Sequence, residues 1–374
     1  MKEINVGIVG TKFMGRSHSN AFIDVPYFFK VPYKPVLKAA CGRDVASLKS
    51  FASNFGWQSI ETSWEKLVAR DDIDLVDIST SNLTHMPIAV AAAKAGKHIL
   101  CEKPLAMDAA EAWKMYTAAE EAGVTHMVAF NYRRVPAIML AKQLIEQGKI
   151  GRIFHFNAVY YQDWIIDPAF HFVWRHDAKE AGSGAHGDLN AHIIDLARYL
   201  AGEIEAVSGA QETFIKERKA DDGQTMKVTV DDATYFLARF QNGALGNFMA
   251  TRFANGRKNF LRIELFGSEG SLVFNLERLN ELEYYSAKED PAVQGFRSIM
   301  VTDGTHPFIN AWWPAGHIIG WEHTFIHEVK DMLDAIAEKK PVYPNFYDGY
   351  RCQQVLDAVA KSAANKRWAE VPEK

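Results

Sequence analysis

Lysine, aspartate and histidine side chains lie in two short motifs, CEKP at Cys101–Pro104 and GDLNAH at Gly187–His192. Side chains of these types hold, donate or accept protons, so both motifs are candidates for acid–base chemistry. The residues alone also allow simpler roles. Lys103 would then be a solvated loop cation, Asp188 a carboxylate favoured near a helix N-terminus, and His192 a hydrogen-bonded core histidine.

Both motifs occur where a predicted element begins or ends. Lys103 follows the apolar strand pattern His98–Leu100, and in doubly wound sheets ligands bind beyond the carboxyl ends of the strands. The Lys-Pro step is expected to stiffen this loop and is compatible with a cis peptide bond. In the second motif, Asp188 and His192 are four residues apart and would share one face of the helix expected at Gly187–Leu200.

A glycine-rich turn near the N-terminus predicts a dinucleotide-binding site. The segment Gly10–Gly15 directly follows a strand pattern, precedes a helix, and matches G-x-G-x-x-G in its first and third glycines. Lys12 replaces the middle glycine, which normally lets the backbone approach a pyrophosphate. An outward-turned Lys12 side chain is compatible with this role, and its ammonium would help to neutralise phosphate. A tight glycine turn without a ligand is the alternative.

The end of the second predicted strand bears on the choice between NAD and NADP. An acidic residue here holds the adenosine ribose of NAD, whereas an arginine accommodates the 2′-phosphate of NADP. The sequence at Cys41–Asp44 is CGRD, in which Arg43 favours NADP and Asp44 favours NAD. Both residues would otherwise be solvated turn residues, so the preference stays open.

Residues 1–125 alternate strand and helix patterns. This alternation predicts βαβ units and a parallel, doubly wound Rossmann sheet. Asp108 with Glu111 is typical of a capping box at the start of the last helix. The strand patterns are Ile4–Val9, Val36–Cys41, Leu75–Ser79 and His98–Cys101, and the helix patterns are Gly15–Ala21, Val45–Phe55, Met86–Ala95 and Asp108–Ala122.

After about residue 131 the pattern changes to consecutive hairpins. We therefore predict a second, α+β domain over residues 126–374, with a large, mostly antiparallel open sheet and flanking helices. The final helix, Tyr350–Asn365, can pack on either domain. The strand patterns are Ile153–Tyr161, Asp232–Phe240, Ala244–Arg252, Asn259–Phe266 and Ser271–Asn275, and a helix pattern at Pro136–Gln147 precedes them.

Composition and charge exclude several classes of protein. The chain has 374 residues, and because single cores stop growing at about 250–300 residues, two domains are expected. The net charge of −4 gives no electrostatic reason to expect nucleic acid or a membrane as a partner. Cys41, Cys101 and Cys352 are widely spaced and form no CxxC pair. With no signal-peptide pattern and no apolar stretch of membrane-spanning length, we expect a cytoplasmic protein.

EKP after a Rossmann-type strand, followed by Asp-x-x-x-His after a glycine-rich loop, resembles the Gfo/Idh/MocA oxidoreductase family over essentially the whole chain. Lys12 and Gly42 depart from the family pattern, which bears on cofactor preference and not on dinucleotide binding. The segments that look closest to the levoglucosan dehydrogenase branch are Phe130–Arg133, Gln162–Trp164, Trp174-Arg175, Gly187–Asp195 and Gly267–Asn275.

The resemblance implies that Lys103, Asp188 and His192 form a catalytic trio. Oxidation of a secondary alcohol sends a hydride to nicotinamide C4 while a base accepts the hydroxyl proton, and an ordinary histidine titrates close to the working pH. On this assignment His192 is the base, Lys103 a polarising donor to the developing alkoxide, and Asp188 the orienting group. The roles of Lys103 and His192 are interchangeable.

The resemblance also implies two sets of binding residues, which together offer hydrogen bonds for hydroxyls and an apolar wall for a sugar's C–H face. Core packing is the alternative for Trp164 and Trp174. The cofactor set is Gly10, Thr11, Lys12, Phe13, Met14, Arg43, Ser79, Thr80, Asn82, His85, Glu102, Lys103, Asn131, Trp174 and Arg175. The substrate set is Lys103, Asn131, Tyr132, Arg133, Gln162, Asp163, Trp164, Asp188 and His192.

The expected function is NAD(P)-dependent oxidation of a ring secondary hydroxyl of a sugar to a ketone, on levoglucosan or another pyranose oxidised at C3. The alternatives are an inositol or cyclitol dehydrogenase, an NAD-dependent glycoside hydrolase on the same scaffold, and a non-enzymatic sugar or dinucleotide sensor. The expected partners are a small sugar or cyclitol and further copies of the chain, as a homodimer or homotetramer joined through an exposed face of the antiparallel sheet.

Two further features are assigned no catalytic role. His323 and His327 are four residues apart, but they lack the glutamate of H-E-x-x-H and a further ligand set. We therefore expect no metal and place them on the exposed or interfacial side of a helix. The aromatic segment Asp303–Trp321 is expected to form a lid or a subunit contact.

Overall fold

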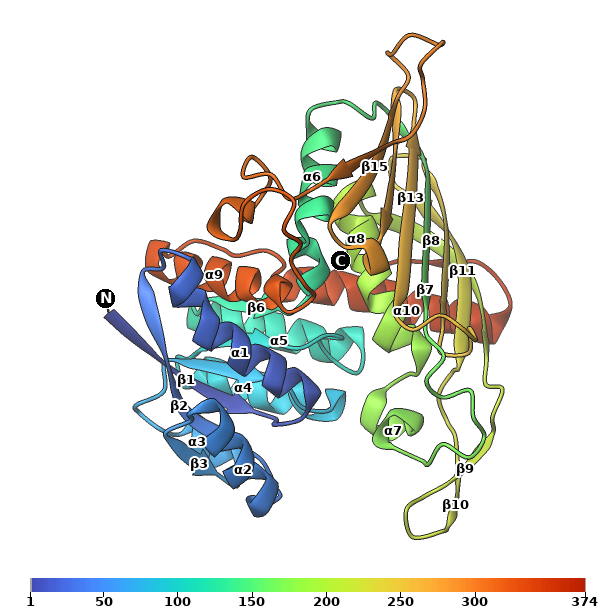
Figure 1. Cartoon of the computed structure of the whole chain (residues 1–374). Coiled ribbons are helices and arrows are strands. Elements are labelled where there is room, and N and C mark those ends of the chain that lie inside the picture. Colours follow the sequence, from blue (N-terminus) through green and yellow to red (C-terminus); the bar gives the residue numbers. More distant parts are fainter. Residues whose placement is uncertain (1, 374) are drawn as a thin grey trace. The chain divides into compact units, whose positions relative to one another are not determined.

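The computed structural model describes residues 2–373, which form two compact units (Figure 1). No helix in this part of the chain is long and apolar enough to cross a membrane. The first unit contains the residues up to Arg134 together with Gly320–Arg351, and the second contains Val135–Ile319 together with the residues from Cys352 onward.

This division differs from the single boundary near residue 125 that we expected. Helix α9 (His323–Glu338) belongs to the first unit because it packs against α1 (Phe13–Phe28). Helix α10 (Phe346–Asn365) begins in the first unit and continues in the second. A late segment of the chain therefore completes the N-terminal unit.

The first unit is built on a six-stranded sheet with strand order β3-β2-β1-β4-β5-β6. All its pairings are parallel. This order, which reverses between β1 and β4, is that of the doubly wound Rossmann fold and confirms the predicted fold class. The strands are β1 (Lys2–Val9), β2 (Tyr33–Cys41), β3 (Ser59–Glu61), β4 (Leu75–Ile78), β5 (His98–Cys101) and β6 (His126–Val128).

Two helices of this unit begin with an aspartate side-chain cap, of which the sequence predicted only the one at Asp108. The Asp44 carboxylate accepts a hydrogen bond from the Ser47 N–H at 2.7 Å, and Asp108 accepts one from the Glu111 N–H at 2.8 Å. Helix α1 begins differently, because its cap residue Lys12 makes no capping hydrogen bond. The two helices with an aspartate cap are α2 (Val45–Phe55) and α5 (Ala109–Ala122). Between them in the chain lie α3 (Trp64–Val68) and α4 (His85–Lys94), and the unit also has 3₁₀ turns at Asn82–Thr84 and Asn131–Arg134.

The second unit is built on a nine-stranded sheet with strand order β16-β15-β14-β13-β7-β12-β11-β8-β17. Its pairings are antiparallel except that of β7 with β12, which confirms the predicted mostly antiparallel sheet. The strands are β7 (Ile153–Tyr161), β8 (Ile204–Glu212), β11 (Ala233–Phe240), β12 (Leu245–Thr251), β13 (Phe260–Gly267), β14 (Gly270–Asn275), β15 (Glu281–Ser286), β16 (Arg297–Met300) and β17 (Ala369–Glu370), with a separate hairpin of β9 (Glu217–Lys219) and β10 (Thr225–Lys227).

Helices cover one face of this sheet and leave the other open. Helices α6 (Pro136–Glu146) and α8 (Ala191–Ala201) lie against the covered face (Figure 1). Beneath them the rings of Phe236 and Phe248 stack with centroids 4.4 Å apart. Strand β11 alternates buried and exposed residues, so that Leu237, next to buried Phe236, lies on the open face. A short helix, α7 (Ala178–Ala181), precedes the π-helical turn described below.

Candidate functional site

The turn between β1 and α1 has a backbone that requires glycine at two positions. Gly10 has a φ of +108°, and a Cβ atom on it would lie 2.3 Å from the Ser79 carbonyl oxygen. A Cβ atom on Gly15 would lie 2.2 Å from the Gly10 carbonyl oxygen. Lys12, which replaces the middle glycine, has an extended backbone and an exposed side chain. A lysine in place of the middle glycine of the motif is therefore compatible with the turn.

The beginning of α1 fits the pyrophosphate of a dinucleotide. Its first turn contains no acidic residue, and no side chain caps its N-terminus. A helix N-terminus presents N–H groups and a positive dipole end, both of which favour phosphate. The exposed Lys12 adds a cation at the same end. Thr11 and Met14 on either side are half-buried, whereas Phe13 is exposed and stacks on Trp321 with a centroid separation of 5.3 Å.

The loop after β2 places Arg43 and Asp44 in different roles. Arg43 is exposed. Asp44 caps α2, and its hydrogen bonds with Ser47 lower the pKa of the Asp44 carboxyl. The structure therefore gives Asp44 a local structural role.

The predicted cofactor residues after β4 are held by short polar contacts. Ser79 is buried and donates a hydrogen bond to Asp77 at 3.1 Å. The Thr84 hydroxyl donates to that of Thr80 at 2.7 Å, and Asn82 is buried. These residues follow the carboxyl end of a central strand, where doubly wound folds bind their ligands.

Lys103 follows β5 in a loop that neighbouring side chains hold in place. The Lys103-Pro104 peptide bond is cis, as the sequence allows. The Lys103 N–H donates to the Glu102 carboxylate at 3.0 Å, and the Pro104 carbonyl oxygen lies 3.0 Å from Nδ1 of His85. His85 is fully buried, and burial lowers its pKa, so the neutral ring donates from Nδ1. Two predicted cofactor residues thus fix the backbone that carries Lys103.

A buried charge cluster, which we did not anticipate from the sequence, adjoins this loop. The ring of His18 on α1 lies between two carboxylates, with Nδ1 2.9 Å from Asp77 and Nε2 3.1 Å from Glu102. Burial lowers the pKa of His18, but the two carboxylates outweigh it and hold that pKa well above its usual value. His18 is therefore an imidazolium that donates from both nitrogens. The signal in the sequence was a charged residue, Asp77, inside an otherwise apolar strand.

In the second unit, Asp188 lies in a π-helical turn, His186–Asn190, that precedes α8. The Asp231 carboxylate holds this turn by accepting hydrogen bonds from the N–H groups of Gly184 at 2.7 Å and His186 at 2.8 Å. A Cβ atom on Gly184 would lie 1.8 Å from the Asp231 carbonyl oxygen, so glycine is required there. Asp188 therefore lies in a π turn and His192 in the regular α-helix that follows it, where the sequence predicted one continuous helix from Gly187 to Leu200.

Asp188 pairs with an arginine that is absent from the predicted set. Nη2 of Arg252, which directly follows β12, donates to the Asp188 carboxylate at 2.7 Å. The Arg252 side chain is buried, and its guanidinium lies 5.5 Å from the Trp164 ring centroid. The only signal in the sequence was a cation at the end of an apolar strand.

A chain of contacts links three more predicted substrate residues of this unit. The rings of His192 and Tyr160 have centroids 5.9 Å apart. The Tyr160 hydroxyl and the Gln162 side-chain amide both donate to Asn259, at 2.8 and 2.9 Å. The Trp164 indole N–H then donates to Gln162 at 2.9 Å. The structure therefore brings Gln162, Trp164 and Asp188 together with His192, and adds Tyr160, Asn259 and Arg252, which sequence reasoning missed.

Other predicted residues of the second unit have different surroundings. The Asp163 carboxylate pairs with Lys258 at 2.7 Å, and this contact lowers the Asp163 pKa. The Arg175 guanidinium lies 4.4 Å from the ring centroid of Trp174. These residues belong to the same loop as Trp164, but Asp163 is engaged in holding the loop after β12.

Three predicted binding residues of the first unit are buried in a 3₁₀ turn. The Asn131 side chain donates to the Thr324 hydroxyl at 2.9 Å, and Arg133 pairs with Asp348 at 3.1 Å. Tyr132 is also buried. The late segment of the chain thus anchors this turn.

The paired histidines of α9 differ from our expectation. His327 is fully buried, with Nδ1 3.0 Å from the Arg134 carbonyl oxygen, so its placement on an exposed face was wrong. Burial lowers its pKa to about 3. Within residues 2–373, no group of three or more histidine, cysteine, aspartate or glutamate side chains is placed to hold a metal ion.

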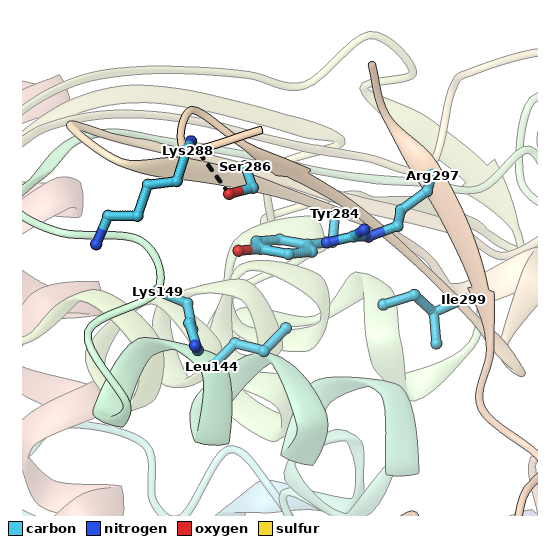
Figure 2. Close-up of a pocket in the computed structure, with 7 residues that line it drawn as sticks. All are labelled: Leu144, Lys149, Tyr284, Ser286, Lys288, Arg297 and Ile299. Atoms are coloured by element: carbon cyan, nitrogen blue, oxygen red, sulfur yellow. Dashed lines mark hydrogen bonds between the residues drawn. The ribbon is translucent and has the colours of Figure 1, made fainter. Parts of the chain in front are cut away.

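A pocket of about 480 Å³ lies in the second unit between α6 and strands β15 and β16 (Figure 2). None of the predicted site residues lines it. Two of its three cationic side chains are paired, Lys288 with Glu269 and Arg297 with Glu289. The residues that line it are Leu144, Lys149, Tyr284, Ser286, Lys288, Arg297 and Ile299. This pocket is therefore separate from the candidate site.

The Rossmann sheet, the glycine turn and the uncapped start of α1 define a dinucleotide-binding oxidoreductase. Residues 4–130 match the family described as "Oxidoreductase family, NAD-binding Rossmann fold", and residues 138–273 match the "GFO/IDH/MocA C-terminal domain". The chain belongs to the Gfo/Idh/MocA oxidoreductase family, as its motifs predicted, and it is an NAD(P)-dependent dehydrogenase.

Relatives cover the full chain. A levoglucosan dehydrogenase of Pseudarthrobacter phenanthrenivorans is 42% identical over 100% of this chain and 99% of its own. The crystal structure of an oxidoreductase domain protein from Kribbella flavida is 50% identical, with a TM-score of 0.97 over 100% of both chains. A levoglucosan dehydrogenase structure in complex with NADH and levoglucosan is 43% identical, also with a TM-score of 0.97 over 100% of both chains.

We predict that His18 stabilises the first unit in a pH-dependent way. Because its folded pKa is raised, the stabilisation is fully present below the unfolded pKa of about 6.5 and is lost as pH rises through the folded value. Urea unfolding between pH 6 and 9 gives the free energy of unfolding of the native protein and of His18→Gln. The amount by which the native value exceeds the variant value should decrease by up to about 1.4 kcal/mol per pH unit. His317→Gln, at an exposed position, is the control and should leave the pH dependence unchanged. A difference that increased with pH would contradict the assignment.

Proposed function

We propose that the protein oxidises a ring secondary hydroxyl of a sugar to a ketone, with levoglucosan or a related pyranose oxidised at C3 as the preferred substrate. The observation that carries this proposal is the linked set of Gln162, Trp164, Asp188 and His192, in which polar groups surround an aromatic face. Sugars need such a combination of hydrogen bonds and an apolar wall. The 42% identity to a levoglucosan dehydrogenase supports the choice of substrate.

Each residue of the proposed trio has a distinct task. His192 accepts the hydroxyl proton, Lys103 donates a hydrogen bond to the developing alkoxide, and Asp188 orients the substrate. Glu102 and His85 hold the loop that carries Lys103. These tasks account for a lysine in a fixed loop and a carboxylate paired with a buried cation.

We propose NAD as the cofactor. The turn at Gly10, Lys12 and the start of α1 would hold its pyrophosphate, and when bound its nicotinamide ring accepts the hydride. The NAD-binding description of the matching family supports this choice. The exposed Arg43 is suited to a 2′-phosphate, so NADP is the alternative to be tested.

The first test measures reduced nicotinamide by absorbance, with NAD and NADP in parallel, against levoglucosan, D-glucose and myo-inositol. We expect NAD reduction to be fastest with levoglucosan and the reduced cofactor to form in proportion to the substrate consumed. Faster turnover of myo-inositol would favour the cyclitol alternative. Product formation without net cofactor reduction would indicate the hydrolase, and no turnover of any compound would favour the sensor.

The second test removes the proposed proton-transfer groups. Loss of a positioned acid or base costs about 10²–10⁴-fold in rate, so His192→Ala and Lys103→Ala should each lower kcat by this range. Binding of NAD, followed by fluorescence titration, should persist in His192→Ala. Lys94→Ala, at an exposed lysine of α4, serves as the matched control and should retain full activity. Full turnover by both variants would refute the proposed trio.

We also propose that the open face of the nine-stranded sheet pairs with a second copy of the chain. Tyr235, Leu237 and Leu245 on this face are each at least half exposed and lie on adjacent strands, next to the exposed Arg239 and Asn247. Exposed apolar side chains that are rimmed by polar residues often mark protein–protein interfaces.

Light scattering after size-exclusion chromatography tests this pairing. The native chain should elute as a dimer or tetramer, and Leu237→Lys should shift it toward the monomer because a buried, unpaired ammonium opposes association. Val293→Lys, in the exposed connection between β15 and β16, is the control and should leave the mass unchanged. A monomeric native chain would disprove the pairing.

A further inference from the structure

Arg252 has a buried guanidinium with few hydrogen-bond partners. Its side chain is only 1% exposed, and Nη2 donates to the Asp188 carboxylate at 2.7 Å. Among residues 2–373, neither Nε nor Nη1 has a hydrogen-bond partner, and both are shielded from solvent. A guanidinium in such a place is stable only if a carboxylate balances its charge, and breaking one side of a buried pair leaves the other uncompensated. Asp188 and Arg252 therefore act as one unit.

The same guanidinium also contacts the aromatic wall of the candidate site. It lies 5.5 Å from the centroid of the Trp164 ring, within the range of a cation–π interaction. Trp164 is fixed at its other end by the hydrogen bond of its indole N–H to Gln162. Arg252 thus touches two proposed substrate residues that come from separate segments, the loop after β7 and the turn before α8.

Two nearby basic residues, His176 and Arg218, do not compete with Arg252 for Asp188. Burial, followed by the nearby Arg218 and Arg252, lowers the pKa of His176 to about 4, so that ring is neutral at pH 7. Arg218 is itself occupied, because it donates to the carbonyl oxygens of Ile165, Asp167 and Phe170. Of these three basic residues, Arg252 is therefore the one that pairs with Asp188.

We propose that Arg252 is a positioning and specificity-determining residue for the dehydrogenase reaction. It fixes the Asp188 carboxylate relative to the Trp164 ring, so that a hydroxyl and the neighbouring C–H face of one sugar are recognised together. This inference rests on the proposed function. The inference extends that function by assigning the geometry of substrate recognition to a residue outside the Asp-x-x-x-His motif.

The test is a double-mutant cycle on the whole enzyme with levoglucosan and NAD. A small misplacement of a substrate-orienting group costs about 10²-fold, so Arg252→Met should lower kcat/KM for the sugar by about that factor while the KM for NAD stays within twofold. Arg252→Lys, which keeps the charge, should recover about tenfold. The double variant Arg252→Met/Asp188→Asn should lose little more than Asp188→Asn alone, because both changes remove one interaction.

Matched variants separate this role from a structural one. Arg262→Met removes an arginine of β13 that is paired with Glu264 and lies outside the site, and it should leave kcat/KM unchanged. Far-UV circular dichroism and thermal unfolding identify variants that fail to fold. If Arg252→Met does not fold, Arg252→Lys and the double variant, which leaves no unpaired buried charge, still complete the comparison.

The outcomes distinguish this inference from the proposed function. If the native enzyme oxidises no sugar, the proposed function fails. Levoglucosan binding by the native protein and by Arg252→Met, monitored by tryptophan fluorescence, then tests the role of Arg252 separately. If the native enzyme is active, a folded Arg252→Met variant within twofold of native kcat/KM would overturn the role of Arg252. Additive losses in the cycle would overturn it as well.

Discussion

Buried cations that are balanced by carboxylates fix the loops that carry the proposed catalytic residues of this protein. A charge in the protein interior is destabilising by several kcal/mol unless it is paired in good geometry. His18 satisfies this requirement with Asp77 and Glu102 in the first unit, and Arg252 satisfies it with Asp188 in the second. In each case the pairing joins segments that are distant in sequence. It also sets the position of a backbone or side chain that the reaction would use.

The sheet topology explains why these groups occur where they do. In the first unit, β4 and β5 are adjacent and parallel, so Asp77 and Glu102 reach the same region near the carboxyl ends of the strands. His18 on α1 then has one carboxylate on each side. In the second unit, β7 and β12 are the parallel neighbours, and both end beside the candidate substrate residues. Gln162 follows the first of these strands and Arg252 follows the second.

Local sequence patterns predicted most of the fold and the motif residues. They did not predict the residues that contact these motif residues in the folded chain. Periodicity and apolar runs predicted α2, β5 and β7 at their observed bounds. The prediction missed β3 and β6, which have only three residues each and so show no period, and it also missed the longer strands β8 and β15. Motifs identified Lys103, Asp188 and His192, whereas Arg252 and Asn259 were missed. Their partners are distant in sequence, and only the register of the large sheet brings them close.

The departures from the glycine fingerprint and from the usual acidic residue after β2 have different physical consequences. Lys12 adopts an extended backbone that any residue can take, so a glycine is not needed there for conformation. What the lysine changes is charge, since it adds a cation beside an uncapped helix N-terminus where an anion is favoured. Asp44 is different because its carboxylate is already used to begin α2. The cation at the turn and the carboxylate that caps α2 thus act on different elements, the first at the start of α1 and the second at the start of α2.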